Sequence, residues 1–415
     1  MNTKPYDIVV YGATGFVGQI LCHYLSDELR DPDLRWAMAG RSKTRLNQVK
    51  VSLGKPHGAI RCLIADAGDE DALRKMCQQT RVVISTVGPY ALHGEPLVRV
   101  CAETGTDYCD LTGEPQWIRR MIDRYQDLAS RSGARIVHCC GFDSIPSDLG
   151  VYFLQQVARK QLGHYCQQVK MRVKRLQGGA SGGTIASMVN AFREASRDRN
   201  LRDEFNNPYS LCPPAERALP AQPSVGVEFD NDFDSWAAPF VMAAINTRVV
   251  LRSNALLEPS YHRNFLYDEA LLTGKGASGK KRARRTAMGL KLMPLVFIVP
   301  PFRWLAMKFL PAPGEGPSIE EQRNGCYDLR FHGIDEEGQS LIVRITGDRD
   351  PGYGSTARML AQAGICLARD IPRENLPGGF WTPATAFGKK LIRRLIDHAG
   401  LKFQLLEQFS QKEKK

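Results

Sequence analysis

The sequence predicts an α/β protein in which an N-terminal, doubly wound parallel sheet precedes a second α+β domain built on a mostly antiparallel sheet. Three observations support this prediction. A glycine-containing turn joins an apolar strand to a helix near the N-terminus, and strand, polar turn and helix then repeat over residues 1–150. From about residue 151, strands instead alternate apolar and polar residues, which is typical of a sheet with one solvated face. We therefore expect a first domain at 1–150, a second at 151–370, and a C-terminal helix and strand at 371–415 that return toward the first domain.

The N-terminal glycine turn has the features of a dinucleotide-binding turn. Gly12, Gly15 and Gly18 follow an apolar strand and lead into a helical pattern. Gly12 permits a tight turn, Gly15 lets the backbone approach a pyrophosphate, and Gly18 permits close packing of the helix on the strand. Free N–H groups at the start of the helix attract the anion. The turn predicts a Rossmann-type fold, and its expected cofactor contacts are Gly12, Ala13, Thr14, Gly15, Phe16 and Val17.

The second strand, expected at residues 34–39, ends in Gly40, Arg41 and Ser42, which we also expect to contact the cofactor. In folds that prefer NAD, an acidic residue about 20 residues after the turn binds the ribose 2′-hydroxyl group. Arg41 stands at about that place here, and a guanidinium group suits a 2′-phosphate. The sequence therefore favours NADP(H) over NAD(H). The alternative is that Arg41 is a solvated arginine at a strand end.

Further strands of the first domain, at 60–66, 81–87 and 134–140, end in polar or glycine-containing turns. Ligands of such sheets bind beyond the carboxyl ends of the strands, so the turn after the strand at 81–87 is expected near the nicotinamide. Asp66 meets either the adenine edge or the backbone of the following turn. The cofactor contacts expected at these ends are Asp66, Gly88, Pro89, Tyr90, Gly141 and Phe142.

Tyr90 and Asp143 are the candidates for catalysis. Both follow strand ends near the expected nicotinamide, where a side chain can manage one proton or orient the substrate. Each role has an alternative. Tyr90 could pack against the nicotinamide ring, and Asp143 could cap the helix that starts near Pro146. His138 lies within a strand and is interpreted as a core histidine. The sequence contains no evident metal-binding cluster, so no metal is expected.

Several motifs resemble those of a known family; they lie at residues 12–16, 39–42, 110–114, 140–148, 310–318, 350–357 and 378–383. With these motifs the chain resembles the saccharopine dehydrogenase-like oxidoreductases, and within them the bacterial trans-acting enoyl reductase branch. The resemblance spans nearly the whole chain and implies hydride transfer with a nicotinamide cofactor. It also implies a lipid-like or carrier-bound unsaturated acyl substrate, although the group includes an amino-acid dehydrogenase as well.

The composition is that of a globular protein. Among 415 residues, 43% are hydrophobic and 24% are charged, which argues against wholesale disorder and against a polytopic membrane protein. The net charge is +12, but six cations without an acid lie within residues 275–285. The charge is therefore local, and no nucleic-acid partner is expected. The eleven cysteines lack paired spacing, which favours a reducing cytosolic setting.

The second domain shows clear strand patterns at 169–176 and in a hairpin at 326–333 and 340–347, with a further strand suggested at 248–252. The glycine-rich stretch at 178–184 is interpreted as a flexible loop near the substrate entrance. Thr382 and Pro383 predict the start of the last helix, and a short strand at 401–405 follows. Sheet-based dimerisation is common for such domains, so a homodimer is expected as one assembly.

The segment at 274–317 is interpreted as an insertion that contains both basic and apolar residues. Its basic half is followed by an apolar run at 290–310, which prolines and cations interrupt too often for a membrane span. Cations beside apolar and aromatic residues suit peripheral membrane contact through 275–310, or contact with an acidic carrier or an acyl chain. The alternative is an insertion packed on the protein's own core behind a solvated basic loop.

Together these patterns predict an NADPH-dependent oxidoreductase that, as the resemblance implies, reduces a carbon–carbon double bond of a lipid-like or carrier-bound acyl chain. One alternative is a saccharopine-type amino-acid dehydrogenase, in which Arg172, Lys174 and Arg175 would hold substrate carboxylates. Another is a catalytically silent nucleotide-binding protein at the membrane periphery. The expected location is cytoplasmic, with contact at the inner face of the membrane as an open alternative.

Overall fold

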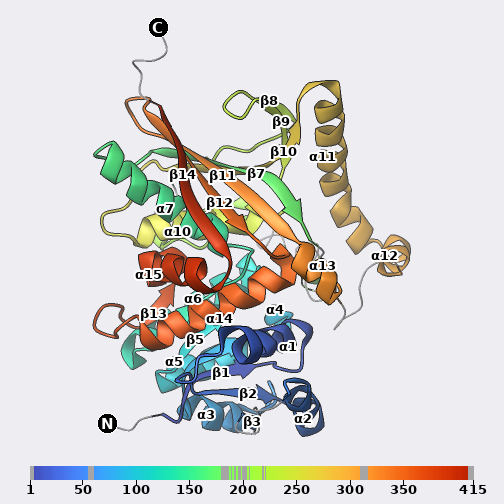
Figure 1. Cartoon of the computed structure of the whole chain (residues 1–415), viewed down its shortest axis with the longest axis vertical. Helices are drawn as coiled ribbons and strands as arrows, with labels where there is room; N and C mark the ends of the chain where they lie inside the picture. The colour runs from blue at the N-terminus through green and yellow to red at the C-terminus, as the bar shows by residue number, and fades with distance from the viewer. Residues whose placement is uncertain are drawn as a thin grey trace.

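A computed structural model describes residues 4–54, 60–178, 187, 189–190, 193–194, 198, 203–204, 206–216, 219, 221–308 and 316–409. Two seven-stranded sheets lie one above the other (Figure 1). Sheet A has the order β13-β6-β5-β4-β1-β2-β3 with parallel pairing throughout, and sheet B has the order β14-β12-β11-β7-β10-β9-β8. Within sheet B, β7 and β10 pair in parallel and the other neighbours pair antiparallel. The predicted fold class is confirmed.

Sheet A is a doubly wound sheet because the strand order reverses at β1, with β2 on one side and β4 on the other. Its strands are β1 (Tyr6–Tyr11), β2 (Trp36–Gly40), β3 (Arg61–Ile64), β4 (Thr80–Ser85), β5 (Asp107–Asp110), β6 (Arg135–Val137) and β13 (Gly379–Trp381). The helices between them are α1 (Phe16–His23) with a π-helical turn η1 (Tyr24–Leu29), α2 (Lys43–Ser52), α3 (Glu70–Gln78), α4 (Tyr90–His93), α5 (Glu95–Thr104) and α6 (Pro115–Ser132).

Sheet B contains β7 (Gln168–Gln177), β8 (Glu228–Asp230), β9 (Ser235–Pro239), β10 (Leu266–Gly274), β11 (Cys326–Ile334), β12 (Ser340–Gly347) and β14 (Leu401–Phe409). The helices of this part include α7 (Ile145–Gln161), the 3-10 turn η3 (Pro214–Glu216), α10 (Ala243–Leu256), α11 (Gly276–Ile298), α12 (Pro300–Met307), α13 (Ile319–Asn324), the π-helical turn η4 (Pro351–Ser355), α14 (Thr356–Arg369) and α15 (Pro383–His398). Thr382 caps α15 through its hydroxyl group, as predicted.

Both faces of sheet A are buried, which explains why its central strands are continuous apolar runs. On one face, side chains of β1 and β4 pack with α1 and α14, and on the other they pack with α3, α5 and α6. The core on the α14 face continues into α7, α15 and the inner face of sheet B. Helix α14 therefore lies between the two sheets (Figure 1).

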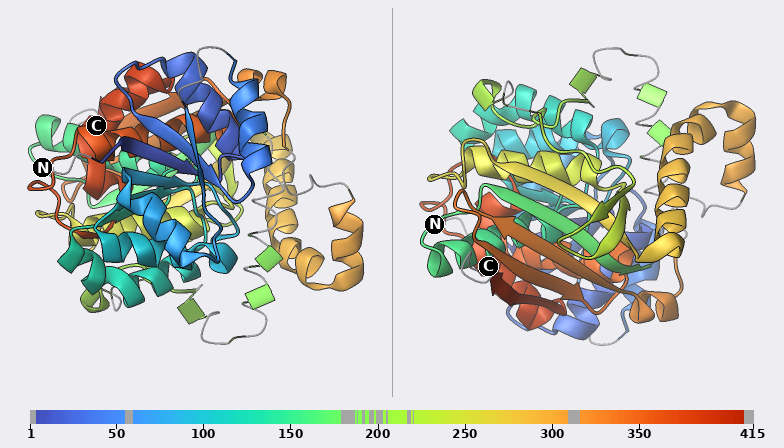
Figure 2. Two further views of the ribbon diagram at one scale, coloured as in Figure 1. Left: turned by 90° about the horizontal axis from the view of Figure 1, so that it is seen from below. Right: turned by 90° about the horizontal axis from the view of Figure 1, so that it is seen from above.

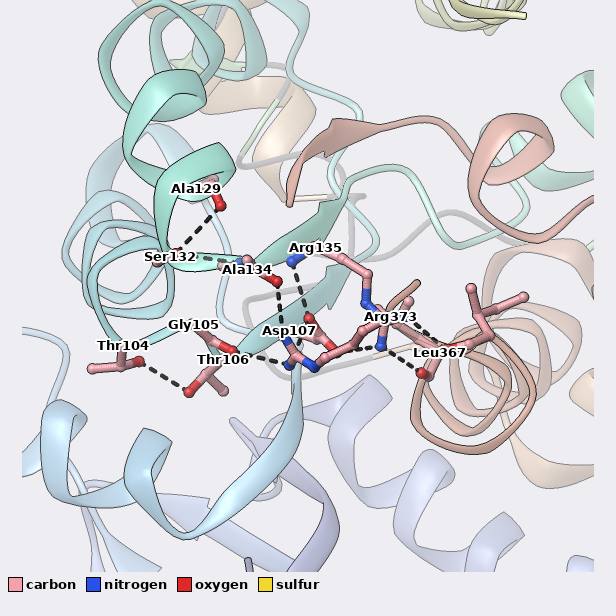
Figure 3. A network of polar contacts seen from close by, with 12 residues as sticks. Thr104, Gly105, Thr106, Asp107, Ala129, Ser132, Ala134, Arg135, Leu367 and Arg373 are labelled. Carbon is pink, nitrogen blue, oxygen red and sulfur yellow. Dashed lines mark hydrogen bonds and ion pairs between the residues drawn. The ribbon is translucent and has the colours of Figure 1, made fainter. Parts of the chain in front are cut away.

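The amino ends of the sheet A strands are closed by a buried ion pair (Figure 3). Arg135 on β6 binds the Asp107 carboxylate and also donates to the carbonyl oxygens of Leu367 (2.9 Å) and Ile371 (2.6 Å). Arg373 approaches the same carboxylate at 3.3 Å and donates to the Gly105 carbonyl at 3.0 Å. These contacts fasten the C-terminal part of the chain to the edge opposite the expected ligand site.

One predicted strand is wrong. Residues 248–252 belong to α10, where Arg248 donates to the Ser210 hydroxyl group (3.1 Å) and Arg252 donates to the Phe380 carbonyl (2.7 Å). Three apolar residues between two arginines fit a short strand, but the same spacing places both arginines four residues apart on one side of a helix. Tertiary contacts of the arginines decide between the two.

The predicted insertion contains a long helix. Helix α11 begins at Gly276, includes Pro294 and packs against β9 and β10 at its N-terminal half, and α12 follows it. Figures 1 and 2 show both helices projecting from one side of the molecule. Within the described ranges, no helix is both long and apolar enough to cross a membrane. Residues 179–184 of the predicted glycine-rich loop and 309–315 of the insertion lie outside the described residues.

Candidate cofactor and reaction site

The glycine turn is anchored on the neighbouring strand β2. Gly12 has a φ of +87°, a conformation that a residue with a side chain rarely adopts. The N–H groups of Gly12 and Ala13 both donate to the Ala39 carbonyl, at 2.9 and 3.2 Å, and the Gly15 N–H donates to the Gly12 carbonyl at 2.9 Å. The Thr86 hydroxyl group at the end of β4 donates to the same Gly12 carbonyl at 3.1 Å. The turn is therefore held at the carboxyl end of β1, between the ends of β2 and β4.

The N-terminus of α1 is suited to an anion. Gly15 is its N-cap, no side chain among the described residues caps it, and its first turn contains no acid. A Cβ atom at Gly18 would lie 2.2 Å from the Gly12 carbonyl oxygen, so only glycine lets the helix approach the turn this closely. The N–H groups of the first turn thus remain available for a phosphate, and these residues fit a dinucleotide.

Beyond β2, the structure separates the side chains of Arg41 and Ser42. Ser42 caps α2 by accepting from the Arg45 N–H at 3.3 Å. Arg41 is exposed, and no partner for its guanidinium group is found among the described residues. At the end of β3, Asp66 accepts from the Gly68 N–H at 2.9 Å, which favours the turn role over adenine contact. Among the described residues, the Arg41 guanidinium group is thus exposed and unpaired at this end of the sheet.

Tyr90, predicted as a catalytic candidate, is held by the main chain. Its side chain is buried, its hydroxyl group donates to the Ser85 carbonyl (2.9 Å), and its ring packs on Trp117 with 5.4 Å between centroids. Burial raises the pKa of the Tyr90 hydroxyl well above its usual value. These contacts favour a packing role over proton transfer. Gly88 is exposed and Pro89 is half-buried at the same strand end.

Glu114 was not singled out by the sequence analysis, although it lies in the polar turn after β5. Its buried carboxylate accepts from the N–H groups of Tyr90 and Ala91, each at 2.9 Å, and from the Ser187 hydroxyl group at 2.8 Å. Burial raises the pKa of Glu114. The carboxylate caps α4 and thereby fixes the turn that follows β4. The position of Glu114 in a polar turn at a strand end could have indicated a functional residue. The N–H groups that it binds are distant in sequence, so the sequence did not reveal its role.

Asp143, the second catalytic candidate, is partly buried, and its carboxylate has no hydrogen-bond partner among the described residues. It does not cap α7, whose N-cap Ser144 also makes no side-chain cap. A Cβ atom at Gly113 would lie 3.0 Å from Oδ2, so glycine there makes room for the carboxylate. Burial raises the pKa of Asp143 to about 6. Such a carboxyl group can hold and release a proton near neutral pH.

Tyr353, in η4, is a second functional candidate that the sequence analysis missed. It is 1% exposed, its hydroxyl group is buried without a hydrogen-bond partner in the described chain, and burial raises its pKa. Its ring meets that of Phe16, at the start of α1, edge to face with 5.0 Å between centroids. Asp143 contributes to raising the pKa of Tyr353, so the two groups interact. An unsatisfied buried hydroxyl group therefore lies beside the α1 N-terminus.

Gly141 and Phe142, predicted as cofactor contacts, are buried at the junction of the two sheets. A Cβ atom at Gly141 would lie 3.1 Å from Thr356, and the Phe142 N–H donates to the Thr356 hydroxyl group at 3.0 Å. The Phe142 ring packs on Tyr327 at 4.9 Å. This environment favours packing over direct cofactor contact. His138 is also buried and binds Asp110 at 2.7 Å, as a core histidine would.

A glycine turn of this geometry at the switch point of a doubly wound sheet defines a dinucleotide-binding protein. The family model of the saccharopine dehydrogenase NADP binding domain matches residues 8–137. Trans-acting enoyl reductases from Mycobacterium tuberculosis and Mycobacterium ulcerans are 38% and 36% identical over 403 and 404 residues, and each alignment covers 94% of this chain and 96% of the relative. A second M. tuberculosis relative, with a provisional form of the same name, is 39% identical over 410 residues at the same coverage. The chain belongs to the family of the trans-acting enoyl reductases.

Solved structures agree with this fold. Saccharopine dehydrogenase (L-Glu forming) from Saccharomyces cerevisiae has a TM-score of 0.53 at 13% identity, and the match covers 97% of this chain and 100% of that chain. Homospermidine synthase from Legionella pneumophila, solved with NAD, has a TM-score of 0.52 at 10% identity, with coverages of 99% and 93%. The saccharopine dehydrogenase-like resemblance is thus confirmed, and the protein is an NAD(P)-dependent oxidoreductase.

Proposed function

We propose that the protein reduces a carbon–carbon double bond of an acyl chain, carried by a carrier arm or a lipid, and that it uses NADPH. The name of its mycobacterial relatives supports an unsaturated acyl substrate. The observation that carries the proposal is Asp143, a carboxyl group with a raised pKa and no partner in the described chain. It lies at the carboxyl edge of sheet A and interacts with Tyr353 beside the glycine turn.

The cofactor would be held by the glycine turn and by the N-terminus of α1, and the exposed guanidinium group of Arg41 supports a 2′-phosphate. A bound nicotinamide would supply the hydride. Asp143 in its neutral form would donate the proton that the acyl α-carbon takes up. The Tyr353 hydroxyl group would donate a hydrogen bond to the acyl carbonyl oxygen, where negative charge develops. Glu114 holds the turn after β4 through two N–H groups and so orients this edge.

Arg172 counts against the amino-acid dehydrogenase alternative. Its guanidinium group is buried and binds both Asp230, at 2.6 Å, and Asp268. A substrate carboxylate would have to displace these partners and leave them buried without a counter-charge. Of the three cations that this alternative needs, one is thus already neutralised.

The test is turnover of an α,β-unsaturated acyl thioester, followed by loss of nicotinamide absorbance. NADPH-dependent reduction is expected, with kcat falling above about pH 6 as Asp143 loses its proton. Asp143→Asn should lower kcat about a hundredfold or more, because it removes the proton donor. Asp127→Asn, at an exposed carboxyl group of α6, is the matched control and should change kcat little.

Two results would contradict the proposal. If the enzyme consumes NADPH with an amino acid or an oxo acid but not with the thioester, the dehydrogenase alternative replaces it. If Asp143→Asn retains full activity and the same pH profile, Asp143 is not the proton donor.

A further inference from the structure

A groove lies between sheet B and α11, away from the glycine turn. It has a volume of about 410 Å³ and is formed by residues of β7, β10 and α11. The lining residues are Val173, Lys174, Arg175, Leu176, Leu271, Leu272, Thr273, Arg282, Arg285 and Thr286. Four of these ten residues are cations and none is an acid, while four are aliphatic. The groove therefore combines positive charge with an apolar floor.

Two adjacent β-bulges shape this groove. Against β11, the pairing shifts between Val173 and Arg175, so Lys174 is an additional residue in β7. Against β9, the pairing of β10 shifts between Leu272 and Gly274, so Thr273 is an additional residue there. The bulges are neighbours because β7 and β10 pair directly, with Val173 opposite Leu271. Bulges re-aim side chains, which explains how four consecutive residues of β7 line one groove.

The helix wall of the groove is fixed in place. Arg282 donates to the Thr273 carbonyl at 2.7 Å, and the Thr273 hydroxyl group donates to the Gly279 carbonyl at 2.9 Å. A Cβ atom at Gly279 would lie 2.0 Å from the Gly274 carbonyl oxygen, so glycine allows α11 to contact the end of β10. These contacts bring Arg285, one turn further along α11, to the groove.

Lys174 and Arg285 have no ion-pair partner among the described residues. Within the part of the chain that the structure describes, Arg175 donates only to the neutral amide of Gln177, at 2.9 Å. Concentrating cations without neutralising acids is costly through mutual repulsion, which a bound anion would relieve. The flanking leucines suit the apolar part of the same ligand.

Strand β7 runs from the groove toward the proposed reaction site. The chain leaves the groove through Leu176 and reaches Gly178, where a Cβ atom would lie 2.6 Å from Pro351 and 2.8 Å from Asp350. Asp350 caps η4, accepting from the Tyr353 N–H at 3.1 Å. The end of β7 therefore connects the wall of the groove with the turn that contains Tyr353.

We propose that this groove binds the phosphate of the arm that carries the acyl substrate, with Lys174 and Arg285 as the principal cations and the leucines contacting the arm. The proposal rests on the proposed function for the identity of the arm, since a carrier-bound acyl chain is attached through a phosphate-bearing pantetheine. It adds a recognition site outside the cofactor site. It also explains part of the local positive charge of the insertion.

The experiment compares the binding of 4′-phosphopantetheine and pantetheine to the full-length protein by calorimetry. Phosphopantetheine should bind roughly tenfold or more tightly, because charge-assisted hydrogen bonds to phosphate are the strong ones. The double variant Lys174→Gln/Arg285→Gln should lose this preference while NADPH binding stays unchanged. A matched control, Arg131→Gln/Lys160→Gln, removes the same amount of charge from exposed sites. This variant should retain the preference for phosphopantetheine.

Equal binding of the two probes, or an unchanged preference in the double variant, would overturn the proposal. A lipid result would also overturn it. If the unaltered protein has no affinity for phosphopantetheine but binds anionic phospholipid vesicles, and the double variant loses that binding, the groove serves a lipid headgroup. The outcome is separable from the proposed function. Groove binding without acyl reduction would support this site and contradict the proposed function. Acyl reduction with an unchanged KM for the acyl substrate in the double variant would support the function and contradict this site.

Discussion

At the scale of single residues, the carboxyl edge of sheet A contains groups that the fold leaves unsatisfied. Asp143 lacks a partner in the described chain, and the Tyr353 hydroxyl group is buried without one. Buried polar groups are almost always hydrogen-bonded, so the Tyr353 hydroxyl group is an exception that a bound ligand would satisfy. At the opposite edge, the Asp107 carboxylate forms ion pairs with Arg135 and Arg373. The contrast distinguishes a reactive edge from a structural one.

Arg41 should determine cofactor preference. Arg41→Ala should raise the KM for NADPH roughly ten- to a hundredfold and that for NADH much less, because a charge-assisted bond to the 2′-phosphate would be lost. Steady-state kinetics with both cofactors measure this. Arg45→Ala, at the neighbouring exposed arginine of α2, is the control and should leave the ratio unchanged. Equal losses for both cofactors would contradict the 2′-phosphate role.

Asp143 should also make stability depend on pH. Its pKa is about 6 in the fold against an ordinary value of 3.8, so the folded state binds the proton more tightly than the unfolded state. The free energy of unfolding should therefore fall as pH rises from about 4 to 6 and level off above it. Asp143→Asn should remove this loss. The free energy of unfolding should then be about 1 to 3 kcal/mol higher than that of the unaltered protein at pH 7 and unchanged at pH 4. Urea unfolding at the two pH values tests this, and a gain that is equal at both would contradict it.

At the scale of elements, two sheets share helices whose ends are fixed by polar contacts. Asp148 in α7 accepts from the Ser253 hydroxyl group of α10 at 2.5 Å and from the Ala384 N–H of α15 at 2.7 Å. Burial raises the pKa of Asp148 to about 7, although both hydrogen bonds act against this. One side chain thus joins three helices between the sheets. These bonds hold the N-terminal turn of α7, which follows Asp143, against α10 and α15.

The ion pair at the amino edge should be essential for stability. Asp107→Asn would leave the buried Arg135 guanidinium group without its counter-charge, which typically costs about 3 to 5 kcal/mol. Thermal and urea unfolding should show this loss, with the cofactor affinity of the remaining folded protein little changed. Glu103→Gln is the control, because its pair with Arg74 is partly exposed and should contribute below about 1 kcal/mol. A loss below about 1 kcal/mol for Asp107→Asn would contradict this role.

At the scale of the whole molecule, α11 and α12 project from the compact body (Figure 2). Their exposed apolar side chains are Met288, Leu292, Leu295, Ile298, Phe302 and Trp304. Such a surface, beside cations, suits an acyl chain or the interfacial region of a bilayer. The long edge strand β14 is the corresponding feature for the predicted homodimer, which stays a prediction.

Membrane contact through this surface should depend on two leucines. Leu292→Asp/Leu295→Asp should strongly reduce cosedimentation with vesicles that contain anionic lipid, because charged groups oppose insertion at the interface. Val51→Asp/Ile396→Asp introduces the same charge at exposed apolar sites elsewhere and should have no effect. If the protein does not cosediment, or if both double variants behave alike, the surface does not contact membranes.

The sequence by itself determined the fold class, the glycine turn and the place of Arg41, because strand periodicity, turn glycines and strand-end residues are local properties of the chain. It also located the insertion that forms the helix wall of the groove. Only the tertiary structure showed that Tyr353 packs against Phe16 and that the Tyr90 N–H donates to Glu114. It also showed that Arg172 is paired with Asp230. It also decided that residues 248–252 are helical and that the two bulges lie side by side. These outcomes depend on which distant side chains share a buried environment, and local sequence patterns do not encode that packing.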